Sequence, residues 1–530
     1  MSWTIGRDIL HAIVLTALLA IWILVCAIRA ITQRPSLRVV SLQICYVVVY
    51  NAFFHHLAMI PGPLLAKYTN LYAAYHAWRG DIHIDVWRCH QTYGDRVRYG
   101  PNRIIINSPR ALHDIYGHGA RVKKYKGYSV LAAQAPNMLT LSDKTQHSRR
   151  RRVISQAFSE SSLRLFEPLL LNRIHRFCAS LRTQVEAGRD WSKPLDMASQ
   201  FHHLTFDSMT GVAFGVDYAT IEDPKFRYVK DAIMKANVRL SVTFQEAKLD
   251  FARLDRKLFR ESALAGLRFV KFLRKLLGTR LANNTESKDI FWFLQQCRDP
   301  DTGEALSVKE LSTETATFLI AGSDTTSTTM SALSYYLSAH PQYYARVANE
   351  VRTTFSDPDE ICLGPKLNSC HFLRACLDES LRLSPPGGAA FWRTVESGGA
   401  YIDGEYFPQG TEVGIGIYAL QHHADHWDAA FEFVPERWTK GKTEDLHQSD
   451  TRLPYFPFGQ GSRSCVGKPL ALNQIMLTFA FLFMEFDFRT AHTLEGREDM
   501  TNGGAVPEFV LKEHISGQAK GPVLCFRRRQ

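Results

Sequence analysis

The longest helix that the sequence predicts carries a polar centre. Helix-forming residues extend from about Val308 to His340, where Pro341 ends the pattern. Such a helix spans roughly 50 Å and would cross a whole domain, so the chain is expected to fold as a large helical body around it. Its middle, Phe318–Met330, reads FLIAGSDTTSTTM and places one carboxylate and six hydroxyls where a core is expected. For Ser327–Thr329 we expect only hydrogen bonds back to carbonyls of the helix, while the rest of the motif indicates a function.

Most of the sequence beyond the Pro61–Pro63 turn also has helical periodicity. Two stretches read as extended instead: Arg96–Asn107, a predicted hairpin, and Ala400–Ile415. Lys468–Glu485 predicts an apolar C-terminal helix. Hydrophobic residues make up 45% of the chain and charged residues 22%, so a large core is available. We expect residues 61–530 to form one mainly α domain with a small β component.

The N-terminus carries a separate apolar run. Residues Ile9–Ile28 are almost continuously apolar, and about 20 such residues span a bilayer. Three arginines follow the run by residue 38, against one before it, which by the positive-inside rule places the rest of the chain in the cytoplasm. Residues 1–38 are therefore predicted to be a single-pass anchor, with a transmembrane helix at about residues 9–28.

A shorter apolar stretch, Val39–Phe54, also contains polar residues. We interpret it as a segment that lies on or dips into the membrane, within a linker of residues 39–60. A second full span is the alternative and stays open.

The formal net charge of +11 suits nucleic acid, an anionic membrane surface or an acidic protein. The Lys and Arg residues are spread along the chain and match no nucleic-acid-binding motif, which argues against nucleic acid. The ten cysteines form no CxxC pair, and Cys362, Cys370 and Cys376 lack zinc spacing. Most cysteines are expected to be plain buried thiols.

Cys465 is different, because it lies in the glycine-rich stretch PFGQGSRSCVGKP just before the predicted C-terminal helix. The start of a helix offers unpaired N–H groups and a partial positive charge, and both stabilise a thiolate. Glycines let the backbone approach a large flat group or adopt positive φ. The neighbours that matter for this interpretation are Phe458, Gly461, Arg463 and Gly467.

Two plainer interpretations compete with this one. A lone cysteine in a glycine-rich loop is usually structural, and Gly459–Gly461 begins the GxG of a dinucleotide-binding loop. The segment YFPF before it is no clean buried strand, however, and GIGIYA at Gly414–Ala419 leads into no convincing helix. A Rossmann site is therefore disfavoured.

The pattern F-x-x-G-x-R-x-C-x-G resembles the haem-binding loop of the cytochromes P450 at every fixed position. The resemblance implies that Cys465 is the thiolate ligand of haem iron and that haem b is the cofactor. It also implies the fold of that family, a triangular α-rich single domain around haem, here preceded by a transmembrane helix.

Other motifs occur in the order of the same family. Glu379 and Arg382 match its E-x-x-R, and the resemblance joins them to Arg437 in a structural network behind the haem; taken alone, such a pair is a common surface feature. Haem propionates need cationic partners. The resemblance gives four candidates: His147, Arg151, Arg393 and Arg463. Of the arginines at 149–152 we expect only Arg151 to turn inward, the others forming a solvated basic run.

The polar centre of the long helix matches the oxygen-binding motif of this family, [AG]-G-x-[DE]-T-[TS], from Ala321 to Thr326. The resemblance implies that Asp324 feeds protons in and that Thr325 holds bound oxygen and a water in line. Ala321 and Gly322 would lie against the cofactor, with Gly322 leaving room for O₂.

By this resemblance the chain is a haem-thiolate monooxygenase, an oxidoreductase that activates O₂. No flavin or nicotinamide fold fits in the chain, so a separate NADPH–cytochrome P450 reductase is implied, with cytochrome b5 as a further candidate donor. The anchor fits members of the endoplasmic reticulum membrane whose catalytic domain is cytoplasmic. A peroxide-using or isomerising relative, and a haem-binding sensor or carrier, are the alternatives.

The predicted walls of the substrate cavity are mostly apolar or small: Ser129–Leu139, Thr315–Ile320, Pro386–Phe391 and Gly503–Pro507. They favour a lipophilic, polycyclic substrate. The overall style resembles fungal enzymes that tailor terpenoids, polyketides or alkaloids in secondary-metabolite biosynthesis. Hydroxylation is the default outcome, with epoxidation, desaturation, ring formation and oxidative coupling as alternatives.

Overall fold

The computed structural model describes residues 42–43, 45–132, 135–185, 190–282, 288–296, 298–299, 302–439, 454–491 and 506–529. The predicted anchor at residues 1–38 lies outside these ranges. Within the described ranges, no helix combines the length and the apolar character needed to cross a bilayer.

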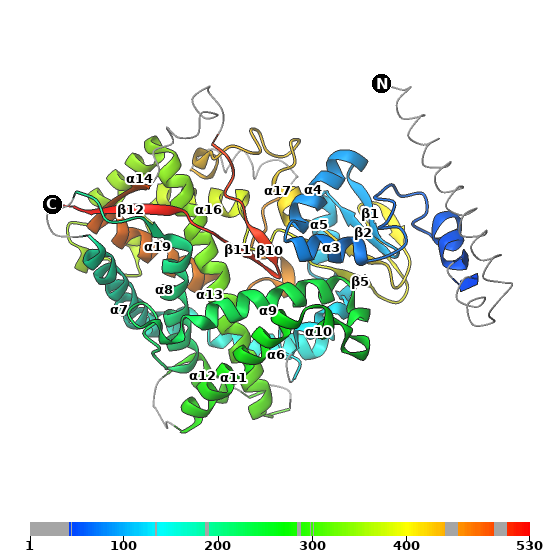
Figure 1. The fold of residues 1–530 in the computed structure, drawn as a ribbon, viewed down its shortest axis with the longest axis horizontal. Coiled ribbons are helices and arrows are strands. Elements are labelled where there is room, and N and C mark those ends of the chain that lie inside the picture. The colour runs from blue at the N-terminus through cyan, green and yellow to red at the C-terminus, as the bar shows by residue number, and fades with distance from the viewer. Residues whose placement is uncertain are drawn as a thin grey trace.

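A broad body of helices makes up most of the molecule, and a smaller region with the β1–β2 sheet adjoins it on one side (Figure 1). The described helices are α3 (Leu71–Arg79), α4 (Ile82–Tyr93), α5 (Pro109–Tyr116), α6 (Lys144–Gln156), α7 (Glu160–Gln184), α8 (Met197–Phe214), α9 (Tyr228–Gln245), α10 (Leu254–Leu258), α11 (Arg260–Ala282), α12 (Ile290–Gln296), α13 (Val308–Ala339), α14 (Pro341–Thr354), α15 (Pro365–Asn368), α16 (His371–Leu383), α17 (Ile417–Gln421) and α19 (Lys468–Glu485).

The β component is small. Its strands are β1 (Arg96–Gly100), β2 (Arg103–Ile106), β3 (Val122–Lys124), β4 (Leu195–Asp196), β5 (Arg393–Val395), β6 (Ala400–Ile402), β7 (Glu405–Phe407), β8 (Glu412–Gly414), β9 (Phe486–Thr490), β10 (Lys512–His514), β11 (Ser516–Gln518) and β12 (Val523–Arg528). They form a five-stranded sheet in the order β1-β2-β8-β5-β3, a three-stranded sheet in the order β4-β12-β9, and the pairs β6–β7 and β10–β11. The predicted hairpin is confirmed as the antiparallel pair β1–β2, with Val97 opposite Ile105.

The long helix α13 begins at a capping box. The Ser307 side chain accepts from the Glu310 amide, and the Glu310 carboxylate accepts from the Ser307 amide, so two otherwise unpaired donors are satisfied. The helix then runs for 32 residues without interruption and ends just before His340 and Pro341. At about 1.5 Å per residue it is roughly 48 Å long, which confirms the prediction.

The C-terminal helix α19 has the predicted bounds and is buried on nearly all sides. Pro469 lies in its first turn, where a missing N–H costs nothing. Residues of α19 such as Leu477 and Phe479 share one core cluster with Leu333 and Tyr336 of α13. The fold therefore fixes the start of α19 relative to α13, and the cysteine loop lies at that start.

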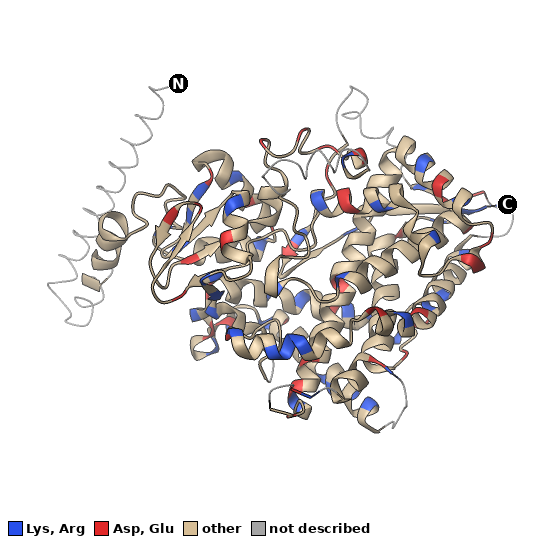
Figure 2. Cartoon of the chain, turned by 180° about the vertical axis from the view of Figure 1, so that it is seen from behind, with Lys and Arg blue, Asp and Glu red and all other residues tan. Residues whose placement is uncertain are grey.

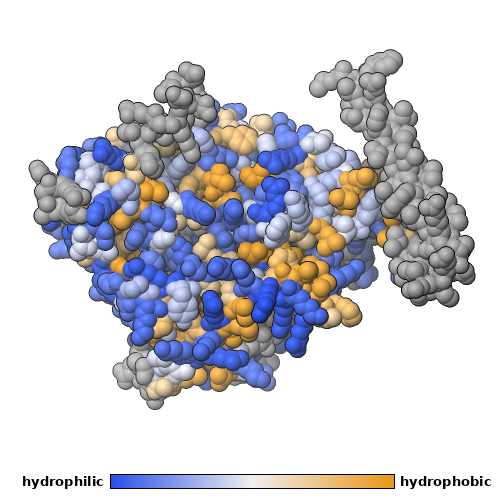
Figure 3. Space-filling view, in the orientation of Figure 1, coloured by the Kyte–Doolittle hydropathy of each residue, from blue (hydrophilic) through white to orange (hydrophobic). Residues whose placement is uncertain are grey.

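The stretch after the predicted anchor is attached to the body through Asn51. Arg98 of β1 is fully buried and donates to Asn51 O at 2.7 Å and to Asn51 Oδ1 at 2.9 Å. In the same stretch Tyr46, Phe53 and Phe54 are exposed. Apolar patches also interrupt the hydrophilic surface elsewhere on the face shown in Figure 3.

Candidate active site

The cysteine loop passes into α19 through Gly467, the residue that precedes the helix. The Cys465 amide donates to Phe458 O at 2.7 Å and closes the loop, while Lys468 Nζ lies 5.5 Å from the centre of the Phe458 ring. Protein surrounds the Cys465 thiol, and yet the residue is accessible. The sulfur therefore lies in a recess that a ligand can enter.

Two glycines of the loop have different tasks. Gly461 has φ +66°, and a Cβ on it would lie 2.1 Å from Tyr116 O, so only glycine fits there. Gly467 has an ordinary φ of −82°. A Cβ on Gly467 would stand 3.9 Å from both Cys465 Sγ and Phe158 Cε1, so glycine keeps the space beside the sulfur open.

Burial raises the pKa of the Cys465 thiol. The amides of Gly467 and Lys468 and the guanidinium of Arg151 act in the opposite direction without outweighing burial. The predicted donors are thus present, but the prediction underestimated the cost of desolvation. A coordinated metal ion deprotonates a thiol outright, so the anion is stable here only with its ligand in place.

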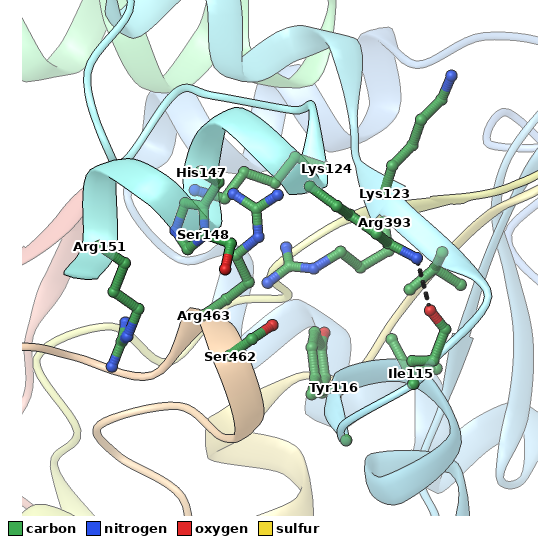
Figure 4. Close-up of a pocket in the computed structure, with 15 residues that line it drawn as sticks. Ile115, Tyr116, Lys123, Lys124, His147, Ser148, Arg151, Arg393, Ser462 and Arg463 are labelled. Atoms are coloured by element: carbon green, nitrogen blue, oxygen red, sulfur yellow. Dashed lines mark hydrogen bonds between the residues drawn. The ribbon is translucent and has the colours of Figure 1, made fainter. Parts of the chain in front are cut away.

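A cationic cavity of about 270 Å³ opens beside the loop (Figure 4). That volume is below the roughly 300 Å³ at which drug-sized sites begin, so the cavity suits the charged edge of a larger ligand. All four predicted propionate partners line it: His147, Arg151, Arg393 and Arg463. Lys123, Lys124 and Lys144 line it as well, and none of the described lining residues is a carboxylate.

The arginine that acts on the thiol is not the one nearest in sequence. Arg463 donates to Leu141 O at 2.6 Å and to Ser142 O at 3.1 Å, both ahead of α6. Arg151 of α6 instead donates to Ser464 O at 2.6 Å, beside the cysteine. Helix α6 therefore places a cation against the cysteine loop from more than 300 residues away in the chain.

Lys124 is a cavity residue that the sequence analysis missed. It is buried on β3, and its Nζ donates to Met138 O at 3.0 Å. Burial lowers its pKa well below the ordinary value, with Arg463 and Arg393 adding to the effect. The only signal in the sequence was the alternation of a strand, which exposes Lys123 and buries Lys124.

The remaining cavity cations also crowd one another. Burial lowers the pKa of His147 to about 3, with Arg463, Lys124 and other cations contributing. Burial likewise lowers the pKa of Arg463 to about 10, with Arg393 as the next cause. Arg393 stands 5.0 Å from the centre of the Tyr116 ring. A ligand with carboxylates at this edge would relieve the repulsion among these groups.

The prediction that only Arg151 turns inward from the basic run is wrong for Arg150. Its guanidinium donates to Glu314 Oε1 of α13 at 2.9 Å and to Glu310 Oε1 at 2.5 Å. Glu314 is fully buried, so it needs a cationic partner, and Arg150 is the one within reach.

Opposite the loop, α13 presents an accessible strip. Ala321 is exposed in a helix that is otherwise mostly buried, and Thr325 follows one turn later, its hydroxyl donating to Ala321 O at 2.7 Å. Phe158 connects the two walls, because its ring lies 5.3 Å from that of Phe318 and it also neighbours Gly467. The strip and the cysteine loop thus flank the same part of the molecule.

Asp324 is buried, with its carboxylate turned toward α8. Its Oδ1 lies 3.2 Å from His202 Nε2. Neighbouring Gly322 also faces α8, where a Cβ would lie 2.6 Å from Met209 Sδ. The structure therefore gives glycine at 322 a packing reason, which differs from the predicted one of leaving room for O₂.

Two of the three following hydroxyls behave as predicted. Ser327 donates to Asp324 O at 3.0 Å and Thr329 to Thr325 O at 2.9 Å, both within the helix. The prediction is wrong for Thr328, whose hydroxyl donates to Gly517 O at 2.8 Å. That bond fastens the β10–β11 hairpin to α13.

The E-x-x-R side chains and Arg437 meet in a buried network. Arg382 donates to both oxygens of Glu379, at 2.8 and 2.9 Å, and Arg437 Nε lies 3.1 Å from Glu379 Oε1. Trp438 Nε1 and the Val434 amide complete the donors. Charge pairing with these arginines keeps the pKa of Glu379 low in spite of its burial.

The predicted cavity wall at 503–507 needs revision. Residues 503–505 lie outside the described ranges. Pro507 O accepts from Tyr335, which is 14 residues beyond Ala321 on α13 and hence roughly 21 Å along the helix. The hairpin β10–β11 is closer, because Gly517 bonds to Thr328 and its amide donates to Pro386 O at 2.7 Å.

The accessible thiol in a recess, the cationic cavity beside it and the accessible strip of α13 together fit haem. Cys465 would hold the iron, and His147, Arg151, Arg393, Arg463 and Lys124 would face the propionates. Among the described residues, no cluster of three or more His, Cys, Asp or Glu side chains is placed to hold a bare metal ion. Cys370 and Cys376 are buried free thiols, as expected, whereas the free thiol of Cys362 is exposed.

Comparisons with known proteins agree with this fit. The family model described as Cytochrome P450 matches residues 61–513. Cytochrome P450 monooxygenase poxM of Penicillium oxalicum is 43% identical over 492 residues, covering 92% of this chain and 93% of that protein. Cytochrome P450 monooxygenase AKT7 of Alternaria alternata is 40% identical over 496 residues, covering 91% and 94%. The cytochrome P450DA heme domain shares the fold, with a TM-score of 0.71 over 89% of this chain and 98% of its own, at 18% identity.

Proposed function

Because the chain belongs to the cytochrome P450 family and is a monooxygenase of that family, we propose that it oxidises a lipophilic small molecule of fungal secondary metabolism. The oxidation uses O₂ and electrons from an NADPH-dependent reductase, with hydroxylation as the default outcome. The observation that carries the proposal is the accessible Cys465 sulfur, which lies next to a cavity whose charged lining residues are all cationic.

Cys465 would hold the haem iron through its thiolate, and the cavity cations would face the propionates. The thiolate-bound haem supplies the chemistry of O–O cleavage, which electron donation from sulfur favours. The chain's own residues do the rest. Phe458, Gly461 and Gly467 shape the loop, and Ala321 lies on the accessible strip of α13, while Gly322 allows α13 to pack closely against α8.

Asp324 and Thr325 are the proposed catalytic pair. Thr325 lies on the accessible strip, where its hydroxyl can hold a water in line with the reacting oxygen. Asp324 takes protons from the interior of the protein and passes them toward that water. The network of Glu379, Arg382 and Arg437 has a structural task, since its groups are saturated by one another.

The substrate class rests on the character of the walls. The stretches 129–139, 315–320 and 386–391 are mostly apolar or small, which supports a terpenoid, polyketide or alkaloid intermediate. Desaturation, ring formation and oxidative coupling are the alternative outcomes within this proposal.

The proposed electron donor is a membrane-bound NADPH–cytochrome P450 reductase, with cytochrome b5 as an additional candidate. Lys and Arg are spread over the whole body among acidic residues (Figure 2), so the proposed docking face is a local one. On α6, Arg150 pairs with Glu314 and Arg151 contacts the cysteine loop, so Arg152 is the exposed cation of the basic run that supports a positive docking face there.

The proposed location is the endoplasmic reticulum membrane, with residues 1–38 as the anchor and the catalytic domain in the cytoplasm. The apolar run at 9–28 supports it, as do the exposed Tyr46, Phe53 and Phe54 in the linker. Fractionation of a host that expresses the full chain tests this location directly.

The experiment that tests the function replaces Cys465 with Ser and records the ferrous carbon monoxide spectrum. We expect the wild type to give the strongly red-shifted band of thiolate ligation and Cys465→Ser to lose it. Survival of the band in the variant would overturn the assignment. Comparing the metabolites of a host with and without the chain then identifies the substrate.

A further inference from the structure

Asp324 has an uncommon partner for a buried carboxylate. Its Oδ1 faces His202 Nε2 at 3.2 Å, and both side chains are buried. The nearest lysine is committed elsewhere, since Lys230 Nζ donates to Ser199 Oγ at 3.1 Å and to Ala198 O at 3.4 Å. An imidazole, unlike a lysine or an arginine, exchanges its proton near neutral pH.

The packing of α8 against α13 fixes this imidazole. Three residues on one face of α8 meet three consecutive residues of α13. His202 faces Asp324, Thr205 Oγ1 donates to Ser323 O at 2.9 Å, and Met209 fills the space that glycine leaves at 322. Residues 202, 205 and 209 recur at helical spacing, so the contact belongs to the helix interface.

The two nitrogens of His202 have different surroundings. Burial lowers its pKa, against the opposing effect of Asp324, so the ring is neutral at pH 7. A carboxylate oxygen only accepts, and Nε2 therefore carries the hydrogen toward Asp324. Nδ1 is then an acceptor, buried and without a partner among the described residues. Such an atom is where a buried water is expected.

A route to the surface lies one helical turn away. Ser199 precedes His202 by three residues on α8 and is half-buried, as is Lys230. Positions three apart lie on the same face of α8, so this half-buried polar edge is the source from which a water at His202 Nδ1 would be exchanged.

We propose that His202 is a positioning residue that holds the carboxylate of Asp324 and returns a proton to it from the α8 side. One proton enters at Nδ1 from a hydronium ion, and the Nε2 proton passes to the carboxylate, so the ring stays neutral and the added charge is neutralised on Asp324. After Asp324 has passed its proton on, Nδ1 releases a proton to water while a water that reaches Nε2 donates one there, which restores the first tautomer. The inference rests on the proposed function, because it concerns the proton supply of the same site.

The test uses the holoenzyme with excess NADPH–cytochrome P450 reductase and no organic substrate. The measurements are the rate of NADPH oxidation, its solvent deuterium isotope effect, and the unfolding temperature by circular dichroism. We expect His202→Phe to slow NADPH oxidation at least ~10-fold and to raise the isotope effect. We also expect it to have no further effect on the rate when Asp324→Asn is already present.

Two further variants sharpen the result. His203→Phe is the matched control. His203 is the next residue of the same helix and is also buried, and no hydrogen bond joins its ring to Asp324. The rate of NADPH oxidation by His203→Phe should stay within about twofold of the wild-type rate. His202→Gln keeps an amide donor for Asp324 but cannot carry a proton through. We expect it to regain the unfolding temperature lost in His202→Phe and to remain slow.

Three outcomes would each overturn the inference. The first is that His202→Phe has the same NADPH oxidation rate and isotope effect as the wild type. The second is that the changes at 202 and 324, when combined, slow the rate by the product of their separate effects, and the third is that His202→Gln has full activity. Failure of the proposed function looks different, because the wild type would then lack the red-shifted carbon monoxide band and would not oxidise NADPH.

Discussion

Two buried carboxylates on two helices of this molecule have opposite surroundings. Glu379 on α16 is saturated by Arg382, Arg437, Trp438 and a main-chain amide, and charge pairing holds its pKa low. Asp324 on α13 has one imidazole as its partner, and that imidazole has an unpaired nitrogen.

The difference separates a group that holds the fold from a group that, in the proposed function, exchanges protons. A carboxylate with four donors, two of them guanidinium groups, cannot release its charge without breaking the network. A carboxylate held by a single neutral imidazole can lose its charge without breaking such a network. Sequence gives no hint of this contrast, because both residues simply occur at motif positions of helices.

The largest expected effect follows from breaking the saturated network. Glu379→Ala leaves the fully buried Arg382 guanidinium without its anion, and breaking a buried pair in this way costs about 3–5 kcal/mol. We expect a fall of that size in the free energy of unfolding, measured in urea, and poor haem incorporation. Glu160→Ala is the matched control, since its pair with Arg164 is exposed and should be worth below ~1 kcal/mol. Equal effects of the two changes would contradict the comparison.

A third buried carboxylate lies between the two extremes. Glu314 of α13 is paired with Arg150 through one oxygen, while its Oε2 has no partner among the described residues. Burial raises its pKa to about 7, so the folded protein binds a proton there more tightly than the unfolded chain does. The stability from this group is fully present below about pH 4.5 and is lost as the pH rises through 7.

Glu314→Gln removes that dependence. The stability of the wild type relative to the variant should fall by up to about 3 kcal/mol between pH 4.5 and pH 8. Urea unfolding of both proteins across this range measures the difference. If the stabilities of the wild type and the variant change in parallel with pH, then Glu314 is ionised over the whole range, or its pKa is the same in the folded protein and the unfolded chain.

A change at Thr325 tests the proposed catalytic role of the Asp324–Thr325 pair. The Thr325 hydroxyl bonds only to its own helix, so Thr325→Ala should cost below ~1 kcal/mol of stability. We expect NADPH oxidation to continue while the peroxide released per NADPH rises several-fold, because the variant lacks the hydroxyl that the proposed function assigns to holding a water. Thr329→Ala, which removes a similar bond one turn later, is the control and should leave this ratio unchanged. A Thr325→Ala enzyme that releases no extra peroxide would refute the assigned role.

How well the sequence predicted these features depends on how local each one is. The bounds of α13 and α19 and the β1–β2 hairpin could be predicted, because periodicity, caps and turn residues lie within a few positions of one another. The cysteine loop could be predicted for the same reason, since its spacing is a property of one short stretch. The resemblance identified His147 and the three cavity arginines, but not Lys123, Lys124 and Lys144.

The features that could not be predicted all join distant segments. Arg150 reaches Glu314, His202 reaches Asp324, and Lys124 meets the cationic cluster only after the sheet and α6 have packed. Helical periodicity identifies the buried face of each helix but not the residue that will oppose it. The predicted amide donors do lower the pKa of the Cys465 thiol, but the larger opposing effect of burial is a property of the whole fold and could not be predicted.

The smallest effect concerns a distant contact of this kind. Thr328→Val keeps the shape of the side chain and removes the hydroxyl that donates to Gly517 O at 2.8 Å. We expect a loss of about 1 kcal/mol in the free energy of unfolding, because a buried carbonyl loses a donor. Thr329→Val removes a hydroxyl that bonds back to its own helix, and it should change stability by below ~0.5 kcal/mol. Equal costs at 328 and 329 would show that the Thr328 bond adds nothing to the other contacts of the hairpin, such as those of Glu513 with Gly80 and Gln518 with Met234.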